Sequence, residues 1–168
     1  MEEISKLLKY NWAYVLWFGV YLLVGTFVIH IFVESAGLSF LYAILIYGIS
    51  ITIALSPIGE IILRTLEGAT PVLIQEDREY LLPLFQEVYE QVKKENPEIS
   101  REINLYITKS MTVNAFAAGR KTIAVTRGAI KALDKEQLKG LLAHEFGHMV
   151  HNDTKALLIT LVGNGFFP

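Results

Sequence analysis

Charged side chains are almost absent from residues 10–59, where Glu34 is the single formally charged residue. Glu34 divides this stretch into two uncharged runs, residues 12–33 and residues 36–57. Each run is long enough to cross a bilayer as a helix, which takes about 20 apolar residues. Because only Glu34 and Ser35 separate the runs, the pattern predicts an antiparallel hairpin of two transmembrane helices at about residues 12–33 and 36–57.

Lysine and arginine positions predict how this hairpin is oriented. Lys6 and Lys9 precede the first run, Arg64 follows the second, and the connection has neither residue type. Since basic residues favour the cytoplasmic side, both ends of the hairpin should face the cytoplasm. We therefore expect a multi-pass protein of the plasma or inner membrane, with the lipid bilayer as a partner and the following polar region in the cytoplasm. His30, inside the first run, is expected to be a neutral imidazole near the outer interface.

The polar region is expected to form a cytosolic domain over residues 77–155, joined to a membrane anchor of residues 1–63 by a linker. The linker is placed at residues 64–76, which contain glycine, proline and mixed polar groups. The next residues place apolar side chains at helical spacing and predict a helix that starts near Leu82, with Pro83 in its first turn, and stops at Asn96-Pro97. The residues that set this spacing are Leu81, Phe85, Val88 and Val92.

Two later stretches alternate apolar and polar residues and predict strands, one over residues 103–108 and one over residues 122–126. Between them, residues 113–119 are rich in small side chains, which let another backbone come close. We interpret the region as a small sheet with the segment Asn114–Ala117 at its edge. Together with the surrounding helices, this predicts an α+β fold.

The last polar helix is expected to begin at Asp134, which forms a capping-box pattern with Gln137. It should end near Asn152-Asp153. Residues 156–168 carry no charge but are too few to cross a membrane. They are expected to open a third hydrophobic segment.

Composition removes several classes of function. The chain has 168 residues, of which 52% are hydrophobic, and its formal net charge is −2. No stripe of lysine and arginine is present, so nucleic acid is not expected as a partner. The chain has no cysteine, which excludes disulfides, thiolate catalysis and cysteine-ligated metal sites.

The strongest chemical signal is the sequence His144-Glu145-Phe146-Gly147-His148. Histidines four apart on a helix project from the same face one turn apart, so both can bind a single ion. Zinc accepts neutral imidazole and favours four ligands. In this motif the glutamate takes the proton of a water activated by the metal. The sequence therefore predicts a site for one zinc ion, with His144 and His148 as ligands and Glu145 as the catalytic base.

A third zinc ligand is not evident. The longer pattern that supplies a third histidine requires glycine and histidine where this chain has His151 and Thr154. No glutamate follows His148. His151 and Asp153 are the local candidates, but His151 lies one turn too far along, and Asp153 is better suited to capping or to a hydrogen bond with a ligand.

The two-span hairpin, residues 114–119, the strand over residues 122–126 and the helix with the histidine pair resemble HtpX-type metalloproteases, relatives of the CAAX prenyl endopeptidases. The resemblance extends over essentially all 168 residues. It implies a gluzincin-like membrane zinc endopeptidase with a cytosolic active site, acting on protein or peptide substrates, including misfolded membrane proteins, in membrane-protein quality control.

The resemblance also assigns residue roles. It makes His144 and His148 zinc ligands, Glu145 the catalytic base, and Asn114, Ala115, Phe116 and Ala117 the strand that pairs with an extended substrate. A turn or backbone cap remains an alternative role for Asn114. The family's third ligand is a glutamate on a later helix, which this chain does not contain, so we expect the 168-residue chain to be an N-terminal portion that binds zinc weakly and cleaves little.

Two other readings remain open. The chain could belong to an inactive or truncated relative that binds peptides without cleaving them. It could also act as a membrane adaptor in which the histidine motif arose by chance.

Overall fold

A computed structural model describes residue 16 and residues 19–151, 153 and 154. The backbone divides into two compact units, Met1–Ile51 and Thr52–Pro168. Each unit is described by itself below. Residues 156–168, expected to open a third hydrophobic segment, lie outside the described residues.

The first unit contains two apolar helices, one over Gly19–His30 and the other α2, Ala36–Ala54, whose last turn enters the second unit. The rings of Tyr21 and Tyr47 lie 6.4 Å apart, and His30 Nδ1 lies 3.5 Å from the Ser39 hydroxyl. These two contacts pair the start of one helix with the end of the other, so the helices run antiparallel.

Among the described residues, α2 is the one helix long and apolar enough to cross a membrane. Gly19–His30 is shorter, and the earlier part of the first expected span, apart from Leu16, lies outside the described residues. The second expected span reached Pro57, but the helix ends at Ala54. Ser56 accepts a hydrogen bond from Ile58 N–H and Pro57 occupies the first turn of a new helix, so a cap and a proline stop α2 early.

This new helix, α3 (Pro57–Leu66), belongs to the second unit. The expected boundaries of the anchor and linker therefore need correction. Residues 64–76 contain the last turn of α3, strand β1 (Thr70–Pro71) and the start of α4. The glycine and proline that suggested a linker mark only the short connections between these elements.

The second unit is built on a four-stranded mixed sheet. Its strands are β1, β2 (Asn104–Thr108), β3 (Ala115–Ala118) and β4 (Thr122–Thr126), in the spatial order β1-β2-β4-β3. Strands β2 and β4 are parallel, whereas β1 and β3 run antiparallel to their neighbours. β3 is an edge strand, in agreement with the sequence. All five residues of the central strand β4 are buried, since both of its faces are covered.

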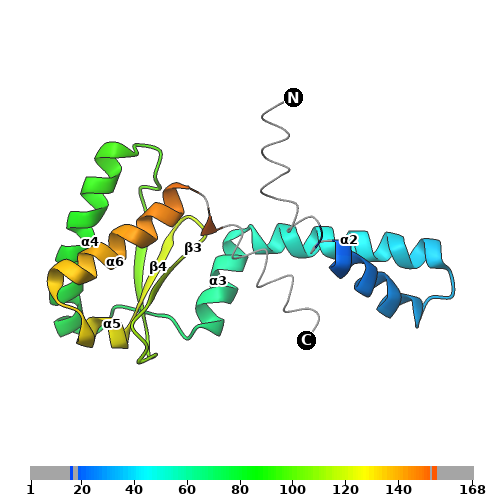
Figure 1. The fold of residues 1–168 in the computed structure, drawn as a ribbon, viewed down its shortest axis with the longest axis horizontal. Helices are drawn as coiled ribbons and strands as arrows, with labels where there is room; N and C mark the ends of the chain where they lie inside the picture. The colour runs from blue at the N-terminus through cyan, green and yellow to red at the C-terminus, as the bar shows by residue number, and fades with distance from the viewer. Residues whose placement is uncertain (1–15, 17–18, 152, 155–168) are drawn as a thin grey trace. The chain divides into compact units, whose positions relative to one another are not determined.

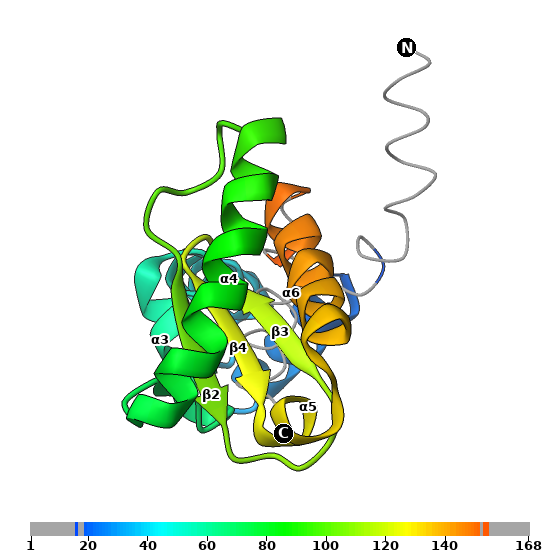
Figure 2. The same cartoon turned by 90° about the vertical axis from the view of Figure 1, so that its left-hand side faces the viewer.

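Helices cover the two faces of this sheet. α4 (Gln75–Glu95) and α6 (Lys135–Val150) lie on one face, α3 lies on the other, and α5 (Arg127–Ala132) follows β4 (Figures 1 and 2). The main core forms where α4 and α6 meet the sheet; its fully buried side chains include Leu81, Ile123, Leu138, Leu142 and Phe146. Helices with a small mixed sheet confirm the α+β class, while the gluzincin-like topology stays a prediction.

α4 corrects one detail of the sequence analysis. It begins at Gln75 rather than near Leu82, and Pro83 lies inside it. An interior proline removes one backbone hydrogen bond, but Pro83 is exposed, so water can reach the freed carbonyl. Burial of Leu84 and Phe85 on the opposite face outweighs this cost.

Candidate active site

α6 brings the two histidines of the motif together. His144 Nε2 and His148 Nε2 lie 3.2 Å apart, and the ring centroids are separated by 4.7 Å. His144 is exposed and His148 partly exposed. The helix is fixed at its start by Asp134, which forms a complete capping box with Gln137, as the sequence predicts. The result is a pair of accessible imidazole nitrogens held on a well-anchored helix.

The spacing of these nitrogens suits a shared metal ion. Two nitrogens that each lie about 2.0–2.1 Å from a tetrahedral zinc ion are about 3.3 Å from each other, close to the 3.2 Å between His144 and His148. Within residues 16, 19–151, 153 and 154, no group of three or more histidine, cysteine, aspartate or glutamate side chains could hold a metal. The described residues therefore offer two donors and not a complete ligand set.

Glu145 points away from solvent toward the sheet. Its side chain is buried, and its Oε2 accepts a hydrogen bond from the Ala117 backbone N–H at 3.0 Å. Burial raises the pKa of the Glu145 carboxyl, whereas His148, the Ala117 N–H and His144 act to lower it. The carboxylate is thus held between the histidine pair and the edge strand.

Two polar residues follow the histidine pair at the end of α6. His148 Nδ1 lies 3.4 Å from Asp153 Oδ2, a distance at which a protonated Nδ1 donates to the carboxylate. Such a bond leaves His148 Nε2 unprotonated and directed at His144. His151 Nδ1 lies 2.8 Å from the carbonyl of Gly147, which can only accept, so the His151 ring donates to the end of its own helix.

The segment Asn114–Ala117 lies beside α6. Asn114 pairs through its backbone with Thr126: its carbonyl accepts from Thr126 N–H at 3.0 Å, and its N–H donates to the Thr126 hydroxyl at 3.1 Å. Ala115 and Ala117 are buried, and Phe116 is partly buried against Leu63 of α3. Backbone groups alternate in direction along an antiparallel strand. Those of Ala115 and Ala117 therefore face away from β4, and Ala117 N–H already binds Glu145.

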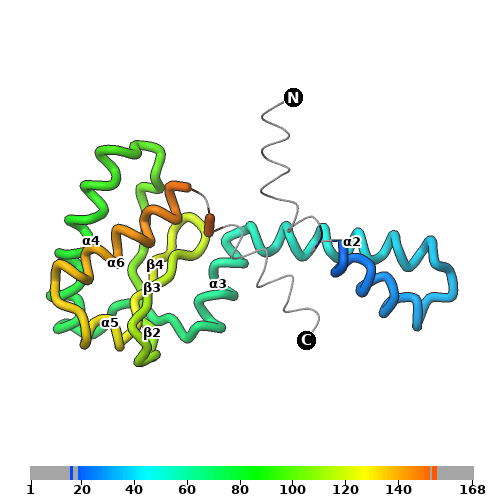
Figure 3. The backbone as a smooth tube through the Cα atoms, viewed as in Figure 1, coloured from blue at the N-terminus to red at the C-terminus, as the bar shows by residue number. Residues whose placement is uncertain are grey.

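Sequence reasoning missed two residues that hold the turn between β3 and β4. Glu60 of α3 accepts hydrogen bonds from Arg120 N–H at 2.8 Å and from the Thr122 hydroxyl at 3.2 Å. Thr154 donates to the carbonyl of Gly119 at 2.8 Å, so the turn lies next to the end of α6 (Figure 3). The sequence contains one signal that could have drawn attention to Glu60: it is the first charged residue after Glu34.

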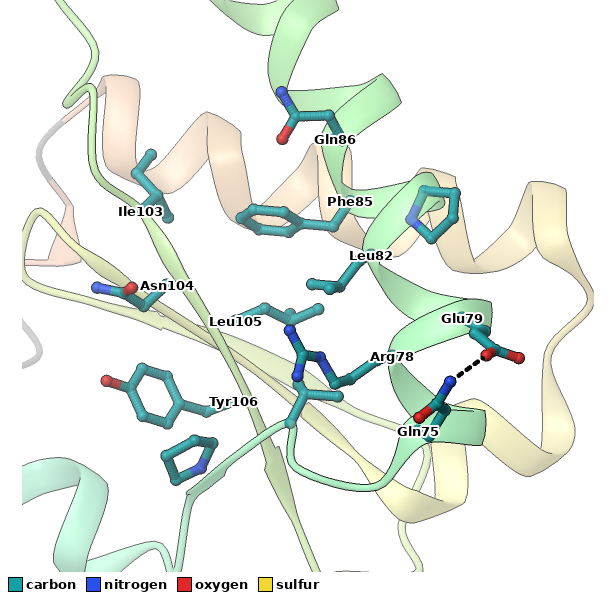
Figure 4. Close-up of a pocket in the computed structure, with 13 residues that line it drawn as sticks. Gln75, Arg78, Glu79, Leu82, Phe85, Gln86, Ile103, Asn104, Leu105 and Tyr106 are labelled. Carbon is teal, nitrogen blue, oxygen red and sulfur yellow. Dashed lines mark hydrogen bonds between the residues drawn. The ribbon is translucent and has the colours of Figure 1, made fainter.

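The site lies apart from a large groove of about 980 Å³ formed by α4 with β1 and β2. Leu82, Phe85 and Leu105 lie in this groove, and Glu79 at its rim accepts a hydrogen bond from Gln75 (Figure 4). None of its lining residues belongs to α6 or β3. The histidine pair on α6 therefore lies outside this groove.

Comparison with known families decides the identity. The model of peptidase family M48 matches residues 80–166, half of the chain, and this match includes α6 and the edge strand. The chain belongs to peptidase family M48. The resemblance to HtpX-type proteases is thereby confirmed, and individual relatives agree with it.

Protease HtpX of Legionella pneumophila (strain Corby) is 44% identical over 54 residues, covering 30% of this chain and 19% of that protein. The Protease HtpX homolog of Helicobacter pylori (strain Shi470) is 40% identical over 65 residues, covering 36% of this chain and 21% of the homolog. The homolog of Aquifex aeolicus (strain VF5) is 42% identical over 65 residues, covering 33% and 22%. The matched part thus spans about a fifth of these M48 relatives.

Proposed function

We propose that this M48 chain contributes the zinc-binding helix of a membrane-anchored, zinc-dependent endopeptidase. The observation that carries the proposal is the 3.2 Å separation of His144 and His148 Nε2, beside a buried glutamate, within the part of the chain that matches the family. Zinc held there would polarise a water molecule and the carbonyl of the peptide bond to be cleaved. A third ligand would come from outside the described residues.

Each residue of this part of the site has a proposed task. His144 and His148 hold the metal through Nε2, and Asp153 keeps the proton of His148 on Nδ1, leaving Nε2 free to bind. Glu145 accepts a proton from water and delivers it to the leaving amine. Because Oε2 accepts the Ala117 N–H, we assign the proton transfer to Oε1.

An extended peptide would bind by pairing with the outer edge of β3. The backbone N–H and carbonyl of Ala115 face that edge, and strand addition is a common mode of peptide recognition. The N–H of Ala117 contributes to the site by holding Glu145. The proposed substrates are therefore protein segments in extended conformation, including misfolded membrane proteins in a quality-control role.

The membrane anchor is part of the proposal. α2 meets the length and hydropathy requirement for a span, and lysines precede the apolar region while Arg64 follows it. We propose that two helices cross the plasma or inner membrane and that the site faces the cytoplasm. The HtpX names of the matched relatives are consistent with this role.

One observation favours a second candidate, a relative that binds peptides without cleavage. The described residues include no group of three or more histidine, cysteine, aspartate or glutamate side chains that could hold one metal ion. A chain with only the histidine pair would bind zinc weakly, while β3 would still offer its edge to a peptide.

Zinc binding by the 168-residue chain tests the metal site. We expect His144→Ala and His148→Ala each to lower the affinity for zinc by more than about 100-fold, because loss of a residue that merely orients a ligand already costs about 10–100-fold. His151→Ala is the matched control, since its ring donates to the Gly147 carbonyl and should leave the affinity unchanged. Equal affinities in all four proteins would overturn the assignment.

Proteolysis of casein by the natural protein that contains these 168 residues separates the two candidates. The endopeptidase proposal predicts cleavage that is lost in Glu145→Gln while zinc binding is retained. Zinc binding without any cleavage by the wild-type protein would instead support the peptide-binding relative.

A further inference from the structure

α3 has a buried inner face and an exposed outer face, and the exposed face is apolar. Its inner face has two buried residues: Leu63 packs against β3, and Gly59 lies against the backbone of Ala54. Its outer face consists of large apolar side chains that are exposed: Ile58 (56%), Ile61 (50%), Ile62 (37%) and Leu66 (75%). These positions follow helical spacing and form one continuous stripe. A contiguous apolar patch of this kind on a surface helix indicates a site that contacts a membrane or another protein.

The charged residues of α3 are turned the other way. Glu60 accepts hydrogen bonds from Arg120 N–H and the Thr122 hydroxyl. Arg64 donates to the hydroxyl of Tyr106, and its guanidinium lies 4.6 Å from the centre of that ring. A helix that faced water would expose such charges and bury its isoleucines. α3 does the reverse, which indicates that its outer face does not meet water.

The chain itself indicates what covers this face. α2, the candidate membrane span, ends at Ala54, and α3 begins at Pro57. Three steps of at most about 3.6 Å keep Pro57 within about 11 Å of the end of α2. A Cβ on Gly59 would lie 2.0 Å from the Ala54 carbonyl oxygen, so the last residue of α2 lies against the first turn of α3. The apolar stripe therefore starts next to the end of the candidate span.

We infer that the outer face of α3 is a lipid-binding surface that lies in the interface of the membrane crossed by α2. The occupant is the boundary between lipid headgroups and acyl chains, where amphipathic helices bury their apolar side by about 5–10 Å. Because the sheet packs on the opposite face of α3, this contact would hold β3 and its turn close to the bilayer. The inference rests on the proposed anchoring by α2 and is independent of peptidase activity.

Site-directed spin labelling tests this surface directly, because the chain has no cysteine of its own. Ile58→Cys and Ile61→Cys would each be labelled in the full chain and reconstituted in phosphatidylcholine bilayers. Ile49→Cys, on the exposed side of α2, reports the span, and Lys131→Cys, exposed on α5, reports water. Collision rates with apolar oxygen and with a water-soluble nickel chelate measure which phase each label meets. Circular dichroism confirms that the labelled chains keep their helices.

We expect the oxygen-to-nickel ratio at Ile58 and Ile61 to exceed that at Lys131 severalfold and to fall below that at Ile49. High nickel access at both α3 positions, with a normal lipid signal at Ile49, would overturn the inference and leave the anchor intact. Low access to both reagents would also overturn it, since a protein surface would then cover the stripe. A water signal at Ile49 would refute the anchor and the inference together.

Discussion

Gly119 provides a sharp test of how the edge strand is held. It lies in the turn between β3 and β4 with φ +57°, a conformation that favours glycine. A Cβ added there would lie 2.0 Å from Oε1 of Glu60 and 2.4 Å from its Cγ. Because the Glu60 side chain is flexible, Gly119→Ala should push its carboxylate aside and break its hydrogen bonds to Arg120 and Thr122.

The cost of this change has two parts. A residue with a Cβ in the left-handed conformation costs about 1–2 kcal/mol. Loss of two hydrogen bonds to a charged group would cost about 1.5–3 kcal/mol each if buried, but Glu60 is only partly buried, so about 2 kcal/mol in total is the appropriate allowance. Gly119→Ala should therefore lower the free energy of unfolding by about 3–4 kcal/mol. In a Glu60→Ala background it should cost only the backbone part, about 1–2 kcal/mol.

These free energies of unfolding can be measured by unfolding the second unit with urea in chains held in lipid nanodiscs. Pulse proteolysis reports the unfolded fraction at each urea concentration. Gly68→Ala is a matched control, because Gly68 has φ +60° and open space around its Cβ position. It should cost about 1–2 kcal/mol with or without Glu60. If Gly119→Ala costs the same in both backgrounds, the turn is not held by Glu60 and our interpretation of this contact is wrong.

Three further substitutions on α6 can be measured in the same unfolding assay. Phe146→Ala removes a fully buried ring whose centre lies 5.3 Å from that of Phe85 and should cost about 3–5 kcal/mol; a cost under 1 kcal/mol would contradict the core assignment. Asp134→Ala removes the acceptor for the Gln137 N–H and should cost about 1 kcal/mol, whereas Asp134→Ser should restore most of it. Gly140→Ala, with no atom within 4 Å of the added Cβ, should stabilise the helix by about 1 kcal/mol, and a loss of stability would reveal a hidden contact.

Local signals in the sequence located some elements well. The capping residue Asp134 and its partner Gln137 fix the start of α6, and alternation of apolar residues located β2 and β4. The start of α4 was missed because its N-cap, Ile74, makes no side-chain capping bond, so no local signal marks it. Pro83 then led us to predict a start near Leu82. The helix forms around Pro83 nevertheless, because burial of its opposite face outweighs the low helix propensity of proline.

Long-range contacts were beyond reach of the sequence. The spacing of His144 and His148 predicts two imidazoles on one face of a helix because the helix is regular. The hydrogen bond from Ala117 N–H to Glu145 joins residues 28 positions apart and depends on how α6 packs on β3. No periodicity encodes such a contact. The same holds for Glu60, whose partners lie about 60 positions later in the chain.

These two contacts form a connected path from α3 to the proposed catalytic base. Glu60 holds the turn at Gly119, the turn ends β3, and Ala117 in β3 donates to Glu145. A shift of α3 would therefore move the strand that is proposed to receive the peptide and also the hydrogen bond that orients the base. If α3 lies in the membrane interface, the strand proposed to receive the peptide and the proposed catalytic base are both positioned by a helix at the lipid surface.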